Sequence, residues 1–229
     1  MNLISVSGAS SRAGKTALAV TLLEAAGPRR AAAVKFTCAE DVFKSCPRGT
    51  PCVVCDIEAP FRMIDDPVVI GEPGTDTDRL RAAGASQVLW TIAREGSIRP
   101  AWAALAARLR GEDLVVMEGS RIVSVARPLL NVFVAHPFLS PERWKPTSPG
   151  LIAEADLVVV NRPTRERRAP SASVMAVLAR YREGREIVVA DVTRPLAEWA
   201  GGLAERLTGM AGRGSTAAEA PSALSLESR

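Results

Sequence analysis

The sequence predicts an α/β fold with a doubly wound, mostly parallel sheet flanked by helices. Short runs rich in valine, isoleucine and leucine alternate along the chain with longer amphipathic segments, which is typical of strands joined by crossover helices. Several of these runs, such as "DLVVM", "DLVVV" and "EIVVA", are apolar at consecutive positions. Such strands are buried on both faces, as in a parallel sheet covered by helices.

The expected elements follow in chain order. Strands are expected over residues 3–7, 32–36, 87–92, 114–117, 131–135, 157–160 and 186–190. Helices are expected over residues 15–26, 77–83, 100–109, 173–181 and 195–207. The segment from about residue 38 to 73 fits the alternation worst, because it has several prolines and no clean period. Long irregular segments in compact domains are usually functional or disordered.

The length of 229 residues favours a single domain over two. We expect this domain to span residues 1–208, with a cysteine-rich insertion at about 38–73. From residue 209 onward the sequence is small, polar and aperiodic, so residues 209–229 are predicted to form a disordered tail.

Composition argues against two classes of partner. No run of about 18 uninterrupted apolar residues exists, so a membrane-spanning helix is not expected. The start "MNLISVSGAS" has no basic flank before its apolar residues and lacks the pattern of a signal peptide, so we expect a cytoplasmic protein.

The formal charge is +4, but with one tyrosine and five phenylalanines the sequence has no interleaving of aromatic and basic residues. Nucleic-acid binding is therefore not expected.

The stretch "ASSRAGKT" after the first strand has the spacing of a phosphate-binding P-loop, with alanine at the usual first glycine. In such a loop successive backbone N–H groups face a phosphate, and the following helix presents its positive N-terminus. A lysine bridges the β- and γ-phosphates, and the next hydroxyl coordinates Mg²⁺. The residues expected to bind the nucleotide here are Ala9, Ser10, Ser11, Arg12, Ala13, Gly14, Lys15, Thr16 and Ala17. The alternative is a chance Gly-Lys-Thr turn.

Two acidic residues are candidates for completing a magnesium site with Thr16. Glu118 follows the buried run "DLVVM", and Asp76 opens a predicted helix in "EPGTDTDRL". Each has a simpler interpretation: Asp76 as a helix N-cap, and Glu118 as a solvated strand end. Asp113 begins its strand rather than ending it, so it is the weaker candidate.

All four cysteines of the chain, Cys38, Cys46, Cys52 and Cys55, lie within 18 residues with the spacing C-x7-C-x5-C-x2-C. Four thiolates suit a zinc ion or an iron–sulfur cluster, and ligand type alone does not separate the two. The alternatives are a redox pair at Cys52 and Cys55 or inert packing. Because loops that follow parallel strands emerge at one edge of the sheet, we expect Cys38 to lie across a crevice from the P-loop.

These motifs together resemble a known family. "GASSRAGKT", Lys35 in "AVKFT", "GTDTDRLRAAGA" and "VVMEGS" are similar to the MobB-type accessory proteins of molybdopterin guanine dinucleotide synthesis, over about residues 3 to 120. Those proteins are P-loop NTPases related to dethiobiotin synthetase. Where the family usually has histidines after the second strand, this chain has "KFTCAEDVFKSC", and its only histidine, His136, lies elsewhere.

The resemblance implies a P-loop NTPase fold and a role for each matching residue. Lys15 and Thr16 would bind phosphate and Mg²⁺, Asp76 and Glu118 would complete the magnesium shell, and Lys35 would lie near the γ-phosphate or a second substrate. The expected catalytic residues are thus Lys15, Lys35 and Glu118. Asn161 lies at the strand end where related enzymes place a purine-contacting asparagine, but the full guanine signature is missing, so ATP and GTP both remain open.

Three functions fit these observations. The first is a Mg-dependent NTPase that couples hydrolysis to handling of a metal or metal cofactor through the four cysteines, with a client metalloenzyme or cofactor-biosynthesis protein as partner. The second is an ATP-dependent ligase or kinase of the dethiobiotin-synthetase type acting on a small molecule. The third is a non-enzymatic binding module with a vestigial loop. Many proteins of this class form homodimers, although nothing in the sequence demands one.

Overall fold

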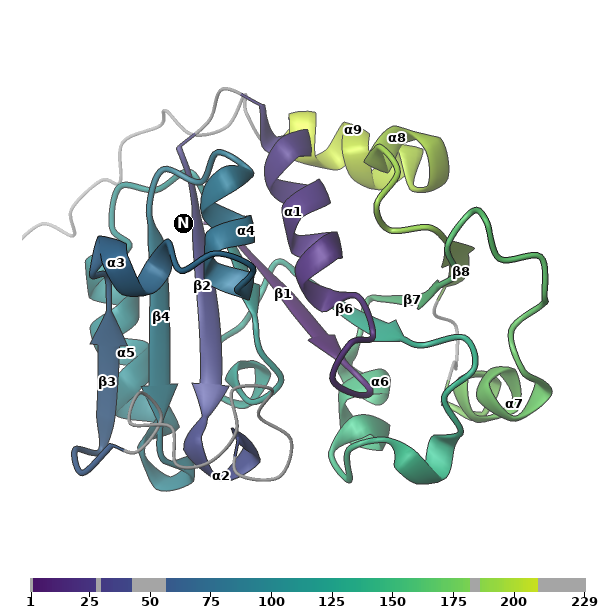
Figure 1. Cartoon of the computed structure of the whole chain (residues 1–229), viewed down its shortest axis with the longest axis horizontal. Coiled ribbons are helices and arrows are strands. Elements are labelled where there is room, and N and C mark those ends of the chain that lie inside the picture. Colours follow the sequence, from purple (N-terminus) through teal and green to yellow (C-terminus); the bar gives the residue numbers. More distant parts are fainter. Residues whose placement is uncertain (1, 28–29, 43–56, 182–185, 210–229) are drawn as a thin grey trace, which may run out of the picture.

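The computed structural model describes residues 2–27, 30–42, 57–181 and 186–209. Within them, one eight-stranded sheet has the strand order β3-β4-β2-β5-β1-β6-β7-β8 (Figure 1). Its strands are β1 (Asn2–Gly8), β2 (Ala31–Cys38), β3 (Phe61–Ile64), β4 (Val88–Ala93), β5 (Leu114–Glu118), β6 (Leu130–Ala135), β7 (Leu157–Asn161) and β8 (Glu186–Ala190). Every neighbouring pair is parallel except β3 and β4. The predicted α/β class with a mostly parallel sheet is confirmed.

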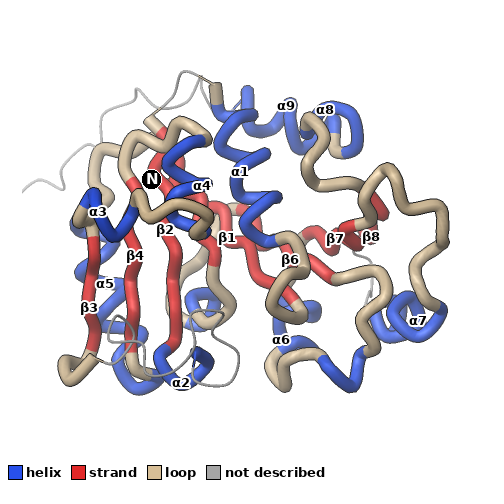
Figure 2. The backbone as a smooth tube through the Cα atoms, viewed as in Figure 1, coloured by secondary structure: helices blue, strands red, loops and turns tan. Residues whose placement is uncertain are grey.

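Helices cover both faces of the sheet, as the runs of apolar residues require. On one face lie α1 (Lys15–Ala26) and α4 (Asp76–Ala82), together with α8 (Leu196–Trp199). On the other lie α5 (Ile98–Arg108), α6 (Ser148–Glu154) and α7 (Ala172–Arg180). The path of the chain in Figure 2 shows the strands side by side, with helices in front of and behind them. The other α-helices are the four-residue α2 (Ala39–Val42) and α3 (Pro67–Ile70) and the nine-residue α9 (Gly201–Gly209).

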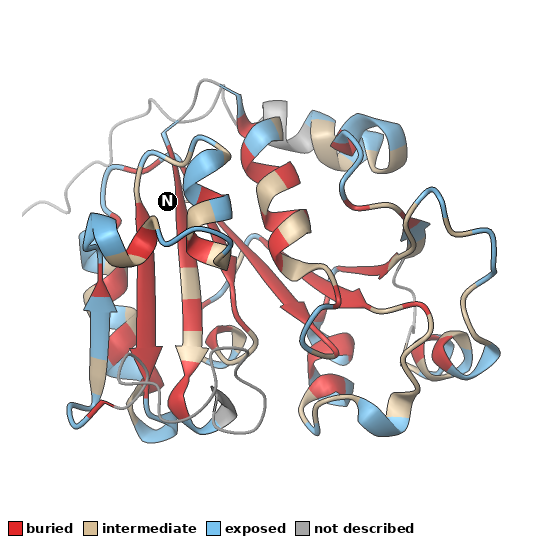
Figure 3. Ribbon diagram, in the orientation of Figure 1, coloured by how far each residue is buried: buried red, intermediate tan, exposed pale blue. Residues whose placement is uncertain are grey.

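The strands divide their side chains between two apolar layers. Ile4 and Val6 of β1 belong to the layer beneath α1, whereas Leu3 belongs to the layer beneath α5. This alternation follows from the two-residue period of a strand. Figure 3 shows the resulting buried sheet between partly exposed helices. Because all strands but β3 run parallel, their carboxyl ends emerge at the same edge of the sheet.

All seven predicted strands are present, and the sequence reasoning missed β3. This strand has four residues, three of them half-buried or exposed, and it lies antiparallel at the sheet edge. The single helix expected over 195–207 is wrong: α8 and α9 are separate, and Ala200 between them has φ −142° and ψ 55°, which is not helical. The helix α6 was also missed, because its first residues, Ser148, Pro149 and Gly150, are poor helix formers.

Parts of two predictions lie outside the described residues. The insertion contains α2, β3 and α3, but its residues 43–56 are not described. The tail expected to be disordered begins at residue 209, and residues 210–229 are not described either. None of the described helices is both long and apolar enough to cross a membrane.

Candidate functional site

The loop that joins β1 to α1 turns sharply between two glycines. Gly14 has φ 105°, a conformation that favours glycine, and a Cβ there would lie 2.1 Å from Nδ2 of Asn161. Arg12 also has a positive φ, of 62°, which is uncommon for a residue with a side chain. Backbone conformations of this kind occur often at ligand-binding loops. The loop is therefore held in a defined shape rather than serving as a simple connection.

This shape presents backbone N–H groups that the described part of the protein does not use. Ala9 donates its N–H to Val134 O at 3.0 Å, and Leu18 donates its N–H to Gly14 O at 2.9 Å. Between these two residues, no backbone N–H donates to another backbone group among the described residues. Helix α1 has no side-chain N-cap bond and no acidic residue in its first turn. A row of N–H groups at a helix N-terminus is an anion-binding arrangement.

Lys15 lies over this loop. Its Nζ donates to Ser10 O at 2.7 Å. Burial, helped by the charges of Lys35 and Lys145, lowers the pKa of Lys15 from 10.5 to about 8, although Glu118 and Asp76 act in the opposite direction. An ammonium group held in a poorly hydrated position beside free N–H groups gains from a bound anion.

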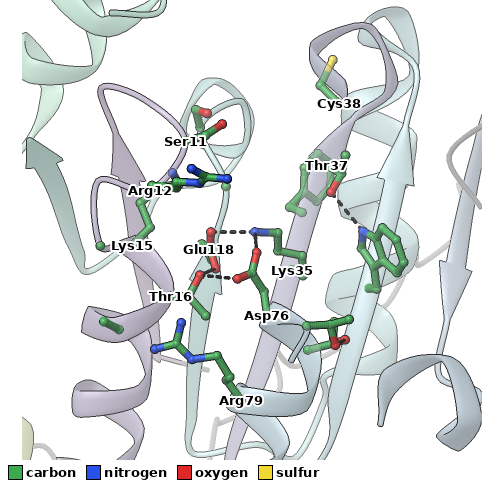
Figure 4. Close-up of a pocket in the computed structure, with 18 of the residues that line it drawn as sticks. Ser11, Arg12, Lys15, Thr16, Lys35, Thr37, Cys38, Asp76, Arg79 and Glu118 are labelled. Atoms are coloured by element: carbon green, nitrogen blue, oxygen red, sulfur yellow. Dashed lines mark hydrogen bonds and ion pairs between the residues drawn. The ribbon is translucent and has the colours of Figure 1, made fainter. Parts of the chain in front are cut away.

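Beside the loop, four side chains from four elements form a closed ring (Figure 4). Lys35 Nζ donates to Asp76 Oδ2 and to Glu118 Oε1, both at 2.6 Å. Thr16 Oγ1 lies 2.9 Å from Asp76 Oδ1 and 2.8 Å from Glu118 Oε2. Burial would lower the pKa of Lys35, but the attraction of Glu118 and Asp76 outweighs it and raises that pKa. Burial would likewise raise the pKa of Asp76, but Lys35, with smaller effects of Thr16 and Lys15, lowers it.

The fold explains why these residues meet. Lys35 and Glu118 are register partners on β2 and β5, and α4 begins at Asp76. The N-cap of α4 is Thr75, whose hydroxyl accepts from Asp78 N at 3.2 Å, so the interpretation of Asp76 as an N-cap is wrong. The interpretation of Glu118 as a solvated strand end is also wrong, because the residue is 2% exposed.

The ring has the donor set that magnesium prefers, one hydroxyl and two carboxylates. The threonine hydroxyl carries one proton, so it can donate to only one of the two carboxylates at a time. The other carboxylate oxygen then faces a lone pair of the hydroxyl, a contact that a cation between them would make favourable. The described residues contain no cluster of three His, Cys, Asp or Glu side chains suited to a metal. Any magnesium here would complete its octahedron with water or phosphate oxygens.

A cavity of about 1010 Å³ contains this ring. Of the predicted loop residues, Ser11, Arg12, Gly14, Lys15, Thr16 and Ala17 line it. Ala9, Ser10 and Ala13 do not line it: Ala9 and Ala13 are fully buried, and Ser10 Oγ is buried with no partner among the described residues. The cavity also has lining residues that the sequence reasoning missed: Thr37, Trp90, Arg79, Arg121 and Lys145.

Some of the missed residues carried a signal in the sequence. Thr37 lies near the carboxyl end of β2, at the edge where a parallel sheet binds ligands. Trp90 lies in the middle of β4, beside Lys35, where its position gave no such signal. Lys145 follows β6 in an irregular segment, and its N–H donates to Ala9 O at 2.9 Å. That contact joins residues far apart in sequence, and no local pattern indicates it.

Cys38 lines the same cavity as Lys15, which confirms that the two loops emerge at one edge of the sheet. Its side chain is buried, and its Sγ donates to Glu40 Oε2 at 3.1 Å. Cys46, Cys52 and Cys55 lie outside the described residues. The zinc or iron–sulfur site therefore stays a prediction.

Asn161 supports the loop from behind. Its Nδ2 donates to Ala13 O at 3.1 Å, and its Oδ1 accepts from Val192 N at 3.3 Å. Both ends of the amide thus hold backbone groups, and Asn161 does not line the cavity with Lys15. A contact between Asn161 and a purine base stays a prediction.

Comparison of the sequence with models of known protein families and with functionally characterised proteins finds no match. The resemblance to MobB-type proteins accordingly depends on the quoted motifs alone.

Proposed function

We propose that this protein has a P-loop NTPase fold and binds and hydrolyses a nucleoside triphosphate, ATP or GTP, with Mg²⁺. The observation that supports this most is the convergence of two structures in one cavity. One is the row of N–H groups at the start of α1, with Lys15 beside it. The other is the ring that holds Thr16, Asp76 and Glu118. A triphosphate chain needs both an anion cradle and a cation site within its own length.

Each group has a distinct task in the proposed reaction. The loop N–H groups and Lys15 bind the β- and γ-phosphates and stabilise the charge that develops during in-line attack by water or a substrate oxygen. Thr16, Asp76 and Glu118 hold the cation. Magnesium bound there would neutralise charge on the phosphate oxygens. Lys35, 2.6 Å from both carboxylates and in the same cavity as Lys15, would contact the γ-phosphate in the bound state.

Hydrolysis is measured directly. We expect phosphate release from Mg·ATP or Mg·GTP, and complete loss of it in Lys15→Ala. Arg99→Ala is a suitable control, because Arg99 is exposed on α5, on the opposite face of the sheet. Hydrolysis retained by Lys15→Ala with intact folding would refute the assignment.

We further propose that hydrolysis serves the handling of a metal or metal cofactor for a client protein. Support comes from Cys38, which lies at the end of β2 in the cavity that also contains Lys35. A thiol there could join the three cysteines that follow it in the sequence in binding zinc or an iron–sulfur cluster. Metal analysis and an absorption spectrum of protein purified without oxygen test this proposal. Unchanged metal content in Cys38→Ser would count heavily against it.

A ligase or kinase acting on a small molecule is the second candidate, and one observation favours it. Thr37 and Trp90 also line the cavity, and neither has a task in binding a triphosphate. Trp90 Nε1 donates to Thr37 Oγ1 at 3.0 Å. The Thr37 hydroxyl is therefore the acceptor in this bond, and its own proton can be donated to a second substrate. Slow hydrolysis stimulated by a client favours the first function, and fast product formation that requires a second substrate favours this one.

A further inference from the structure

Lys35 already bridges the two carboxylates that would bind a magnesium ion. Its ammonium group is 2.6 Å from one oxygen of Asp76 and 2.6 Å from one oxygen of Glu118. The second oxygen of each carboxylate contacts Thr16. All four carboxylate oxygens are thus engaged within the ring. One unit of positive charge already neutralises much of the charge that would attract a divalent ion.

Magnesium would bind the same two carboxylates at much shorter distances. It binds carboxylate and hydroxyl oxygens at about 2.0–2.1 Å with nearly ideal octahedral geometry. An ammonium group that contacts both carboxylates would also lie within a few ångströms of the metal, and two cations at such separation repel strongly in a buried site. Lys35 and magnesium therefore cannot share the pair of carboxylates in the arrangement that this structure shows.

We infer that Lys35 acts as an internal counter-cation for Asp76 and Glu118, and that it excludes free Mg²⁺ until a nucleotide draws the ammonium group onto its phosphates. The inference rests on the proposed function, because it states how the same site is loaded. Its consequence is that the metal enters with the triphosphate and not before it.

The side chain of Lys35 is suited to this exchange. It is 21% exposed, while that of Glu118 is 2% exposed, so the lysine can move within the cavity and the carboxylate cannot leave it. Lysine carries its charge on a flexible four-carbon stem. A triphosphate in the loop would supply a new set of oxygens for the ammonium group, and the metal would replace it at the carboxylates. No charged group loses a partner in this exchange.

The test is binding of Mg²⁺ alone, without nucleotide, to the full chain, measured by titration calorimetry and by the change in melting temperature. We expect wild-type protein to show no binding at millimolar Mg²⁺. Lys35→Met removes the ammonium group and keeps an unbranched side chain of similar length. It is expected to bind Mg²⁺ at least about tenfold more tightly than wild type, and its melting temperature should rise as the ion is added.

Two controls make the result specific. Arg79→Met removes another cation that lines the cavity, and it should leave Mg²⁺ binding as weak as in wild type. Lys35→Met combined with Glu118→Gln should lose the binding gained by Lys35→Met. Tight binding of free Mg²⁺ to wild-type protein would overturn the inference without any variant, even if Lys35→Met fails to fold. Weak binding to a folded Lys35→Met variant would overturn it as well. A separate titration with Mg·ATP and Mg·GTP reports on the proposed function, so either idea can fail alone.

Discussion

Replacing Lys15 by methionine should stabilise the protein in the absence of nucleotide. Burial and nearby cations lower the pKa of Lys15 from 10.5 to about 8, so the folded state disfavours its charged form. That lowering of the pKa corresponds to roughly 3 kcal/mol at neutral pH. The bond from Nζ to Ser10 O, which the variant loses, stabilises by about 1 kcal/mol. The net gain at neutral pH is therefore expected to be about 2 kcal/mol.

The sign of this effect depends on pH in a defined way. Below about pH 8, Lys15 is charged in both the folded and the unfolded protein, and the full penalty applies. Between about pH 8 and 10.5, the unfolded chain binds more protons than the folded one, so the wild-type free energy of unfolding rises with pH. The advantage of Lys15→Met should shrink through that interval.

Urea denaturation of wild type and Lys15→Met at pH 7 and pH 10, without nucleotide, measures both quantities. The same variant should bind no nucleoside triphosphate, which separates stability from function at one side chain. The argument that burial of the Lys15 charge destabilises the folded protein is refuted by either of two results. One is a Lys15→Met variant that is less stable than wild type at pH 7. The other is a difference in free energy of unfolding between variant and wild type that is the same at pH 7 and pH 10.

Three further predictions concern binding and turnover. Bound phosphates should raise the pKa of Lys15, so nucleotide binding should take up about half a proton at pH 8 and about a tenth of a proton at pH 7. The affinity for nucleotide should therefore fall above pH 8. Calorimetry in two buffers of different ionisation enthalpy measures the proton uptake, and no uptake at pH 8 would contradict this prediction. Glu118→Gln should lower Mg-dependent hydrolysis about 100-fold, whereas Asp113→Asn at the start of the same strand should leave it unchanged; equal rates in the two variants would argue against the cation site. Lys145→Ala should weaken triphosphate binding about tenfold, with the exposed Arg143→Ala as control; equal affinity of both variants would remove Lys145 from the binding site.

The parts of the fold that could be predicted are those in which local pattern and burial agree. The strands "LVVM" and "LVVV" are apolar on both faces, so each of their residues indicates a strand that is buried on both sides. The edge strand β3 is half-exposed and short, and its "FRMI" sequence carries no such signal. The break between α8 and α9 depends on the backbone at Ala200, where the sequence "EWAGG" was compatible with a continuous helix as well.

The candidate site shows the same division. Lys15 and Thr16 follow from spacing, because the loop and the helix that hold them are consecutive in the chain. The pairing of Lys35 with Glu118 could be anticipated only as a shared sheet edge, since it depends on the register between β2 and β5. Lys145 could not be anticipated, because its contact with Ala9 spans the whole N-terminal half of the domain and uses only backbone atoms.

Equilibrium binding of Mg·ATP and Mg·GTP to wild-type protein, measured by titration calorimetry at pH 7, tests the central claim most directly. We expect one equivalent of at least one of the two nucleotides to bind per chain, with the affinity lost when magnesium is chelated. The absence of binding of either nucleotide at millimolar concentration, to a protein whose melting curve shows that it is folded, would contradict the assignment of this cavity as a triphosphate site.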